Sequence, residues 1–344
     1  MKTVFSFLFC WIIVPVVLLG LHLWSFGALY FAPIQVESLR FTIAYVYGAG
    51  IPLAVLILLI FRLKKWAVIL PLAAFLCVLA YEWQIQPKKE GHYQPQVEKT
   101  AYADIRGDKI VLHNIRNAVY GTVDDFVVRW ETREFDLREI RTLDVYVNYW
   151  GIDSVAHVFV SFGFSDGRYL AVSIEYRPEV GETYGTFNGL FKQYEIVYVW
   201  ADERDVARLR TNYRKEDVYL YRTTLVPDQV RKLFVSMIEK TNAIHEKPEF
   251  YNSVTQSCTN TIGDHLINAK VLDIPFWKRR ILTGSADRRL YENGLLETWG
   301  KPFPELRIES NINAKAQAAD QDPDFSKKIR TLFIAKPESQ RRIL

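Results

Sequence analysis

The chain has 344 residues, of which 49% are apolar and 24% are charged, and its formal net charge is +4. This length is enough for a membrane anchor and one sizeable globular domain. The small net charge, without a basic stripe carrying interleaved aromatic residues, excludes a typical nucleic-acid-binding protein. No cysteines or histidines are paired at the spacing of a zinc site, so we expect no metal and no other cofactor.

Three long apolar segments lie near the start of the chain, at residues 5–32, 41–61 and 66–81. Each is close to the roughly 20 residues that cross a bilayer as a helix, and the third is the shortest. Trp24 and Tyr30 lie near the end of the first segment, where the amphipathic rings of membrane proteins gather. The sequence therefore predicts three transmembrane helices. We place the anchor at residues 1–85, a linker at 86–105 and a soluble domain at 106–344.

The charges beside these segments predict the orientation of the anchor. The short turn at residues 62–65 carries three basic residues, and basic turns favour the cytoplasmic side. Lys88 and Lys89, just past the third segment, weaken this bias, and an inverted topology is the alternative. We expect the N-terminus inside and everything after about Trp83 on the outer side of the membrane.

The clearest hairpin of the soluble part joins residues 156–162 to residues 170–176, which both alternate between apolar and polar side chains. The turn residues allow a two-residue Asp-Gly loop or a three-residue Ser-Asp-Gly loop. Only the three-residue loop, with Gly167 left-handed, places the apolar residues of both strands on one face. In that register His157 lies directly across from Glu175 on the other face, with Cβ atoms roughly 4.5–5.5 Å apart.

The remaining pattern predicts an α+β fold with an antiparallel sheet and a helix that bears a cysteine. Apolar residues at helical spacing mark the clearest helix, at residues 227–245. Other helices are expected at residues 202–212 and 258–269, and other strands at residues 109–113, 125–131, 143–149, 194–200 and 218–223.

Cys258 is the one cysteine outside the apolar segments, so it has no internal partner there for a disulfide. It lies at the start of a predicted helix, with Ser257 as a suitable N-cap. A helix N-terminus stabilises a thiolate and lowers the pKa of the thiol. The backbone N–H of Cys258 is a natural oxyanion donor at this position. The alternative is that Cys258 is a small buried apolar residue.

A thiolate nucleophile needs a base within hydrogen-bond reach and a third group that orients the base. His265 shares a helix with Cys258 but lies two turns away, about 10.5 Å, which is too far for direct proton transfer. His157 is the histidine that the strand pattern places against a carboxylate. We therefore expect a catalytic triad of Cys258, His157 and Glu175. The alternative is that His157 pairs with Glu175 only to stabilise the strands.

Two groups of residues are candidates for substrate binding. Arginines in the predicted helix at residues 202–212 can bind a phosphate or carboxylate, although a solvated or salt-bridged helix face is the alternative. Residues 274–280 combine apolar and aromatic groups with three cations, which suits contact with an anionic lipid surface unless the aromatic rings pack inward. The residues expected to bind substrate are Arg204 and Arg210 from the first group and Trp277 from the second. Tyr251 and Asn252, in the loop before the helix of Cys258, are expected to bind substrate as well.

A histidine on a strand that precedes a cysteine at a helix start resembles the circularly permuted, NlpC-type papain-like fold, and the lecithin:retinol acyltransferase family has the same order. More closely, residues 146–270 resemble the Lnb family of bacterial membrane proteins. The residues that carry this resemblance are His157 with Phe162-Gly163-Phe164, Ser173-Ile174-Glu175-Tyr176-Arg177, Ala201-Asp202-Glu203-Arg204, Arg210-Thr211-Asn212-Tyr213-Arg214, Tyr251-Asn252 and Ser257-Cys258-Thr259-Asn260.

The resemblance implies a papain-like thiol enzyme in the periplasm, anchored in the bacterial inner membrane by several spans. Lnb-type proteins are lipoprotein N-acyltransferases, so membrane lipids and lipoprotein N-termini are the implied partners. By position, Cys258 would carry the acyl group as a thioester, His157 would move the proton and Glu175 would orient His157. A cysteine peptidase or amidase acting on cell-wall peptides and a non-enzymatic envelope module are the competing hypotheses.

Overall fold

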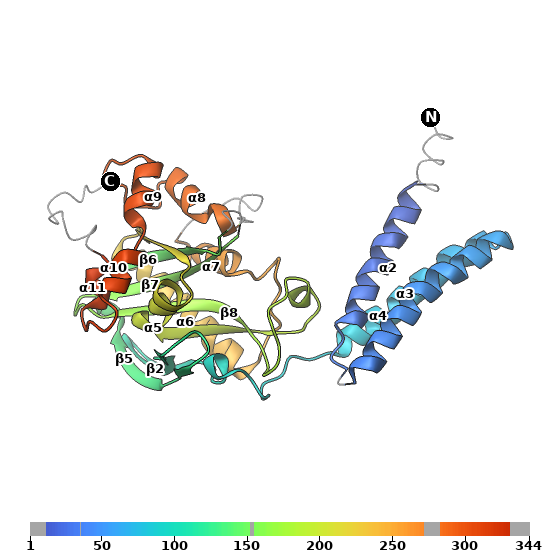
Figure 1. Cartoon of the computed structure of the whole chain (residues 1–344), viewed down its shortest axis with the longest axis horizontal. Coiled ribbons are helices and arrows are strands. Elements are labelled where there is room, and N and C mark those ends of the chain that lie inside the picture. Colours follow the sequence, from blue (N-terminus) through green and yellow to red (C-terminus); the bar gives the residue numbers. More distant parts are fainter. Residues whose placement is uncertain (1–11, 35, 152–154, 272–282, 331–344) are drawn as a thin grey trace. The chain divides into compact units, whose positions relative to one another are not determined.

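The computed structural model describes residues 12–34, 36–151, 155–271 and 283–330 (Figure 1). The contacts between Cα atoms divide the chain into two compact units. The first unit, the anchor unit, comprises Met1–Lys88 together with Thr183–Glu195 and Phe250–Ser253. The second, the sheet unit, comprises Lys89–Glu182, Ile196–Glu249 and Val254–Leu344.

The anchor unit contains three apolar helices, α2 (Val14–Tyr30), α3 (Glu37–Ile60) and α4 (Lys64–Gln84). α3 and α4 are long and apolar enough to cross a membrane, whereas α2 has 17 described residues and is shorter. Large apolar side chains point outward from these helices, including Val46 at 66% and Ile60 at 68% exposure. Such surfaces require an apolar surrounding phase, as membrane-spanning helices do.

The sheet unit is built on one eight-stranded sheet. Its order is β1-β2-β9-β8-β7-β6-β10, and β5 also pairs with β2. The ladders β1–β2, β2–β5, β6–β7, β6–β10 and β7–β8 are antiparallel, whereas β2 meets β9 in parallel at Arg116↔Ala201, so the sheet is mixed. The expectation of an antiparallel sheet therefore holds for these ladders but not for the contact of β2 with β9, because alternation within a strand does not tell which strand becomes its neighbour. The strands of this sheet are β1 (Tyr102–Arg106), β2 (Lys109–Arg116), β5 (Trp130–Asp136), β6 (Ile140–Tyr149), β7 (Ala156–Phe164), β8 (Tyr169–Arg177), β9 (Glu195–Asp202) and β10 (Asp217–Arg222), while β3 (Val119–Tyr120) and β4 (Phe126–Val127) form a separate pair.

Helices pack against both faces of the sheet. α6 (Pro227–Glu246) places Phe234 against Phe162 and Trp200, and Trp200 Nε1 donates to Thr241 on the same helix. On the opposite face, Phe159 packs in a buried cluster with residues of the later helices. The other helices are α5 (Glu203–Arg208), the π-helical turn η5 (Leu209–Tyr213), α7 (Cys258–Asn268), α8 (Ala286–Glu292), α9 (Phe303–Ser310), α10 (Asn313–Ala318) and α11 (Phe325–Lys328).

The segment before β1, which the sequence assigned to a linker, is packed within the sheet unit. Tyr93 and Val97 are buried, and the Arg177 side chain donates to the Val97 carbonyl oxygen at 2.9 Å and lies over the Tyr93 ring. The polar composition of this segment concealed these contacts, because they depend on one buried arginine from β8.

Candidate active site

Cys258 is the first residue of helix α7, as the sequence predicted. The Ser257 hydroxyl accepts a hydrogen bond from the Asn260 backbone N–H at 3.4 Å, which confirms Ser257 as the N-cap. The first backbone N–H groups of a helix have no intrahelical partner, and the positive end of the helix dipole lies there. Cys258 is 7% exposed, so its thiol lies in a buried, electropositive position.

The hairpin of β7 and β8 has the register that the apolar pattern predicted. Gly167 is left-handed with a φ of +85°, and the Phe164 N–H donates to the Arg168 carbonyl at 3.0 Å. The ladder then pairs Phe162 with Leu170 and Val160 with Val172. Continued by three residues, this register sets His157 across from Glu175, and the His157 Nε2 and Glu175 Oε1 atoms lie 3.2 Å apart.

The hydrogen-bonded pairing of β7 with β8 stops before the strands end, and the sulfur of Cys258 lies at that point. After Val160↔Val172, the next hydrogen-bonded position would join Val158 to Ile174. At that position the Val158 backbone N–H donates to Cys258 Sγ at 3.4 Å. Helix α7 contacts both β7 and β8. A strand backbone thus supplies a hydrogen bond to the sulfur, beside the imidazole of the preceding residue.

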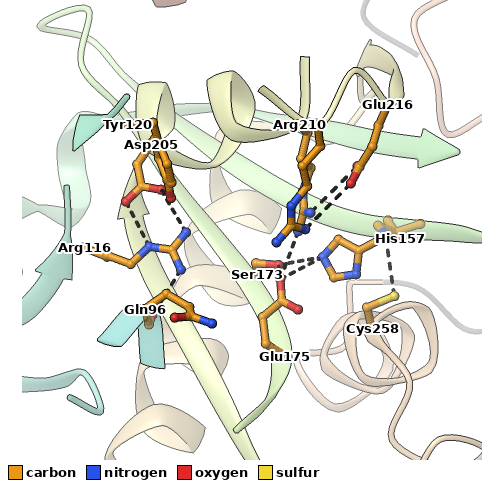
Figure 2. Close-up of polar contacts among 12 residues, drawn as sticks. Gln96, Arg116, Tyr120, His157, Ser173, Glu175, Asp205, Arg210, Glu216 and Cys258 are labelled. Atoms are coloured by element: carbon orange, nitrogen blue, oxygen red, sulfur yellow. Dashed lines mark hydrogen bonds and ion pairs between the residues drawn. The ribbon is translucent and has the colours of Figure 1, made fainter. Parts of the chain in front are cut away.

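Ser173 joins the predicted histidine and carboxylate. Its Oγ lies 2.7 Å from His157 Nε2 and donates to Glu175 Oε1 at 2.6 Å. Because Ser173 donates to the carboxylate, it accepts from His157 Nε2, which leaves Nδ1 as the ring nitrogen for the thiol. Figure 2 shows the imidazole lying between the Ser173–Glu175 pair and the Cys258 sulfur.

The electrostatics of the cluster favour a thiolate beside an imidazolium. Burial works against the charged form of all three groups. Glu175 and the thiol nevertheless outweigh burial and raise the pKa of His157 to about 9, with Arg210 opposing them. Burial raises the pKa of the Cys258 thiol, but the His157 imidazolium and the Val158 N–H outweigh it, and the net pKa is lowered. His157, Arg210 and Ser173 together hold the pKa of Glu175 well below its usual range despite its burial.

Arg210 contacts the carboxylate of Glu175. Its Nη2 donates to Glu175 Oε1 at 3.0 Å, its Nη1 lies 3.9 Å from Glu216 Oε2, and its guanidinium lies over the Phe159 ring. The Arg210 side chain is buried between these two carboxylates (Figure 2). Its contacts therefore orient Glu175, and its expected role in substrate binding stays a prediction.

A second buried ion pair fixes the segment that carries Arg210. Asp205 in α5 accepts two hydrogen bonds from Arg116 at 2.9 Å, one from the Ala118 N–H and one from the Tyr120 hydroxyl (Figure 2). Since α5 leads directly into η5, this cluster holds Arg210 in register with Glu175. Removing one partner of such a buried pair costs about 3–5 kcal/mol.

The other residues singled out from the sequence lie in several places. His265 is a core histidine, with Tyr198 and Ser236 hydroxyls at 2.7 and 2.8 Å from its ring nitrogens. Arg204 is partly exposed on α5, where its N–H donates to the Asp202 carboxylate of the N-cap. Tyr251 and Asn252 belong to the anchor unit, and Trp277 lies outside the described residues.

Ser173 is the site residue that sequence reasoning left without a role. The predicted register already placed it on the face of His157 and Glu175, two residues before the carboxylate. That signal was available, but a serine on a strand face is common and marks no site by itself. Only the folded structure shows that its hydroxyl bridges both neighbours.

The anchor unit and the sheet unit define a membrane-associated protein with a thiol-bearing α+β domain. Residues 126–283 match the family model of the Lnb N-terminal periplasmic domain, a match that spans the region where the resemblance was expected. This match supports the assignment of residues 126–283, most of which lie in the sheet unit, to the Lnb family. No curated protein and no solved structure matches the chain significantly.

Proposed function

We propose that the protein is a periplasmic cysteine acyltransferase of the bacterial inner membrane. It moves a fatty acyl group from a membrane lipid, through a Cys258 thioester, to the N-terminal amine of a lipoprotein. Three transmembrane helices and a permuted papain-like arrangement of the domain belong to this proposal. Arg204, Tyr251, Asn252 and Trp277 are its candidate contacts with substrate.

In the first step, the Cys258 thiolate attacks the carbonyl carbon of a lipid ester. An S–C bond forms, the ester C–O bond breaks, and the His157 imidazolium gives its proton to the leaving alkoxide. The backbone N–H of Cys258, at the start of α7, donates to the oxyanion that develops on the carbonyl oxygen. The products are a neutral imidazole, a lipid alcohol and an acyl thioester on Cys258.

In the second step, an unprotonated primary amine attacks the thioester carbonyl. A C–N bond forms and the C–S bond breaks, while His157 takes one proton from the amine. This regenerates the thiolate–imidazolium pair. Glu175 and Ser173 hold the imidazole in one tautomer through both steps.

The observation that carries the proposal is the convergence of three groups on one sulfur. Cys258 Sγ lies at a helix N-terminus, accepts a hydrogen bond from Val158 at 3.4 Å and is paired electrostatically with His157. A structural cysteine needs none of these contacts. The match to the Lnb domain and the two helices of the anchor unit that are long and apolar enough to cross a membrane favour a lipid-linked substrate.

The test is mass spectrometry of the full chain reconstituted in phospholipid vesicles. We expect an acyl adduct on the Cys258 peptide that hydroxylamine removes, and its transfer to a diacylglyceryl peptide with a free N-terminal cysteine amine. Cys258→Ala should abolish both. Cys77→Ala is the matched control, because Cys77 is an exposed cysteine of α4 and should have no effect.

Two outcomes would contradict the proposal. No thioester in the wild type, together with Cys258-dependent cleavage of a cell-wall peptide, would replace the acyltransferase by a cysteine amidase. No Cys258-dependent reaction with either substrate would leave the thiol with a structural role.

A further inference from the structure

The anchor unit contains an apolar pocket of about 430 Å³, which no step of the reaction above uses. One wall is the C-terminal part of α2, including Leu23, Trp24, Gly27 and Tyr30, and the other is formed by Phe187 and Phe191. The volume is within the range of about 300–1,000 Å³ that is usual for small-molecule sites. The lining is almost wholly apolar, so a polar solute would lose hydrogen bonds on entering.

The second wall is fastened to the helices by polar contacts. Lys192 Nζ donates to the Glu82 carbonyl in α4 at 2.6 Å, and Gln193 Nε2 donates to the Phe31 carbonyl just after α2. The Phe191 ring stacks on Phe31 with centroids 5.4 Å apart. The pocket is therefore a fixed feature of the anchor unit.

Gly27 makes the close approach of this wall possible. A Cβ atom on Gly27 would lie 2.3 Å from the Phe191 ring, nearer than side chains approach one another. Gly20 lies two turns earlier on the same helix, and a Cβ there would meet nothing within 4 Å. The glycine at position 27, unlike that at position 20, shapes the pocket.

The pocket opens onto surface that needs an apolar surrounding. Leu23 and Phe187 both line it, yet they are 59% and 69% exposed. Neighbouring side chains of α2 are also exposed, with Val16 at 62% and Leu19 at 57%. The surroundings that cover these side chains in a membrane are lipid chains, and the pocket is continuous with that surface.

We propose that this pocket binds one acyl chain of a membrane phospholipid. A flexible, unbranched chain can enter from the lipid-covered face of α2 and pack against the aromatic rings of the other wall. The inference that the pocket binds lipid depends only on the structure of the pocket. That the bound chain belongs to the acyl donor rests on the function proposed above.

The experiment is photo-cross-linking of the full chain in phosphatidylethanolamine–phosphatidylglycerol vesicles. A small fraction of the phosphatidylethanolamine carries a diazirine midway along one acyl chain, and the background is Cys258→Ala so that no chain is consumed. We expect adducts concentrated on the peptides that contain residues 23–31 and 187–191. Unlabelled phospholipid should compete, and glycerophosphoethanolamine, which lacks chains, should not.

Two variants and one control decide the result. Gly27→Leu should reduce these adducts about tenfold, as a loss of about 1.4 kcal/mol of binding would. Gly20→Leu adds the same side chain to the same helix and should leave them unchanged. Leu190 also lines the pocket, so Leu190→Trp, which enlarges that side chain and leaves Gly27 unchanged, should also reduce the adducts and decides the case if Gly27→Leu fails to fold.

Labelling spread evenly over α2, α3 and α4, and unchanged in both pocket variants, would mean ordinary surrounding lipid and would overturn the inference. The proposed function can fail separately. Specific cross-linking without a Cys258 thioester in the wild type would support lipid binding by the pocket and contradict the proposed acyl transfer. A thioester without specific cross-linking would support the acyl transfer and contradict lipid binding by the pocket.

Discussion

The backbone N–H of Val158 donates to the sulfur of Cys258 at 3.4 Å, although the residues are 100 positions apart in the chain. The preceding residue, His157, supplies the imidazole. One short stretch of β7 therefore delivers both groups that stabilise a thiolate. A change that moves this end of β7 will affect both contacts at once.

The pKa of Cys258 gives the first prediction. Because the net pKa of the thiol is lowered, more thiolate exists at neutral pH, and alkylation by iodoacetamide should reach its midpoint below the ordinary value of about 8.5. His157→Gln removes the largest lowering cause and should move the midpoint upward. The rate of alkylation across pH 5–10 measures this.

His265→Gln is the control for that measurement. His265 lies on the same helix as Cys258, but its burial lowers its pKa to about 4, so it is neutral over the measured range. A wild-type midpoint at or above 8.5 would contradict an activated thiol.

Glu175→Gln should shift the alkaline limit of the acylation reaction to lower pH. The active pair needs a protonated His157, and its pKa of about 9 sets where that form is lost as the pH rises. Without the carboxylate, burial dominates and the pKa of His157 falls, so the imidazolium disappears at lower pH. We expect the rate at neutral pH to fall on the order of 10²-fold or more.

The pH–rate profile of thioester formation measures this effect, and the titration of the His157 ring by NMR gives the pKa directly. Glu175→Asp keeps the charge and should retain more of the alkaline limb than Glu175→Gln. An alkaline limb that stays at about 9 in Glu175→Gln would show that another group sets it.

Ser173→Ala should slow thioester formation, because the His157 imidazole loses a hydrogen bond that orients it. Its hydroxyl connects His157 Nε2 to Glu175, and a hydrogen bond to a charged group contributes about 1.5–3 kcal/mol. We expect about a tenfold or greater loss of the rate of thioester formation, with a lower pKa in its pH profile. Intact-protein mass spectrometry at timed intervals gives the rate.

Ser161→Ala is the matched control, since Ser161 is a fully buried serine of the neighbouring strand on the same face. Its hydroxyl has no hydrogen-bond partner among the described residues, so its loss should leave the rate unchanged. Equal losses in the two variants would mean that Ser173 acts through packing alone.

Arg330→Met should destabilise the sheet unit. Arg330 is 1% exposed, with Nε donating to Asp144 at 2.7 Å and Nη1 to Glu203 at 2.7 Å. Removing its charge leaves two buried carboxylates, at a cost of about 3 kcal/mol in the free energy of unfolding. This is the lower end of the usual range, because Arg222 still pairs with Asp144 and Tyr146 with Glu203.

Denaturant unfolding of the full chain in micelles, followed by tryptophan fluorescence, measures that change. Arg138→Met is the control, because Arg138 is 64% exposed where it pairs with Asp136, and exposed pairs contribute little. If both variants unfold like the wild type, the ion pairs of Arg330 do not contribute measurably to the stability of the sheet unit.

The local parts of the site were predictable from the sequence because short-range physics decides them. The Gly167 turn and the alternation of β7 and β8 fix the register that sets His157 against Glu175. Ser257 before Cys258 marks the start of α7 in the same way. These elements depend only on neighbouring residues or on strands joined by a tight turn.

Contacts between distant segments were not predictable. Two examples are the parallel contact of β2 with β9 and the ion pair of Arg210 with Glu175. Each joins segments whose sequence patterns do not predict which other segment they contact. The Arg116–Asp205 pair was hidden for the same reason, since a charged residue looks like a surface residue until its partner is known.

By itself, the sequence determined that a thiol begins a helix, that an imidazole faces a carboxylate across a hairpin, and that apolar helices precede both. Only the tertiary structure decided that the sulfur lies where β7 and β8 stop pairing, so that the Val158 N–H donates a hydrogen bond to it. The physical reason is that turns and caps are set by adjacent residues. The meeting of a strand end with a helix end is set by the packing of the whole sheet.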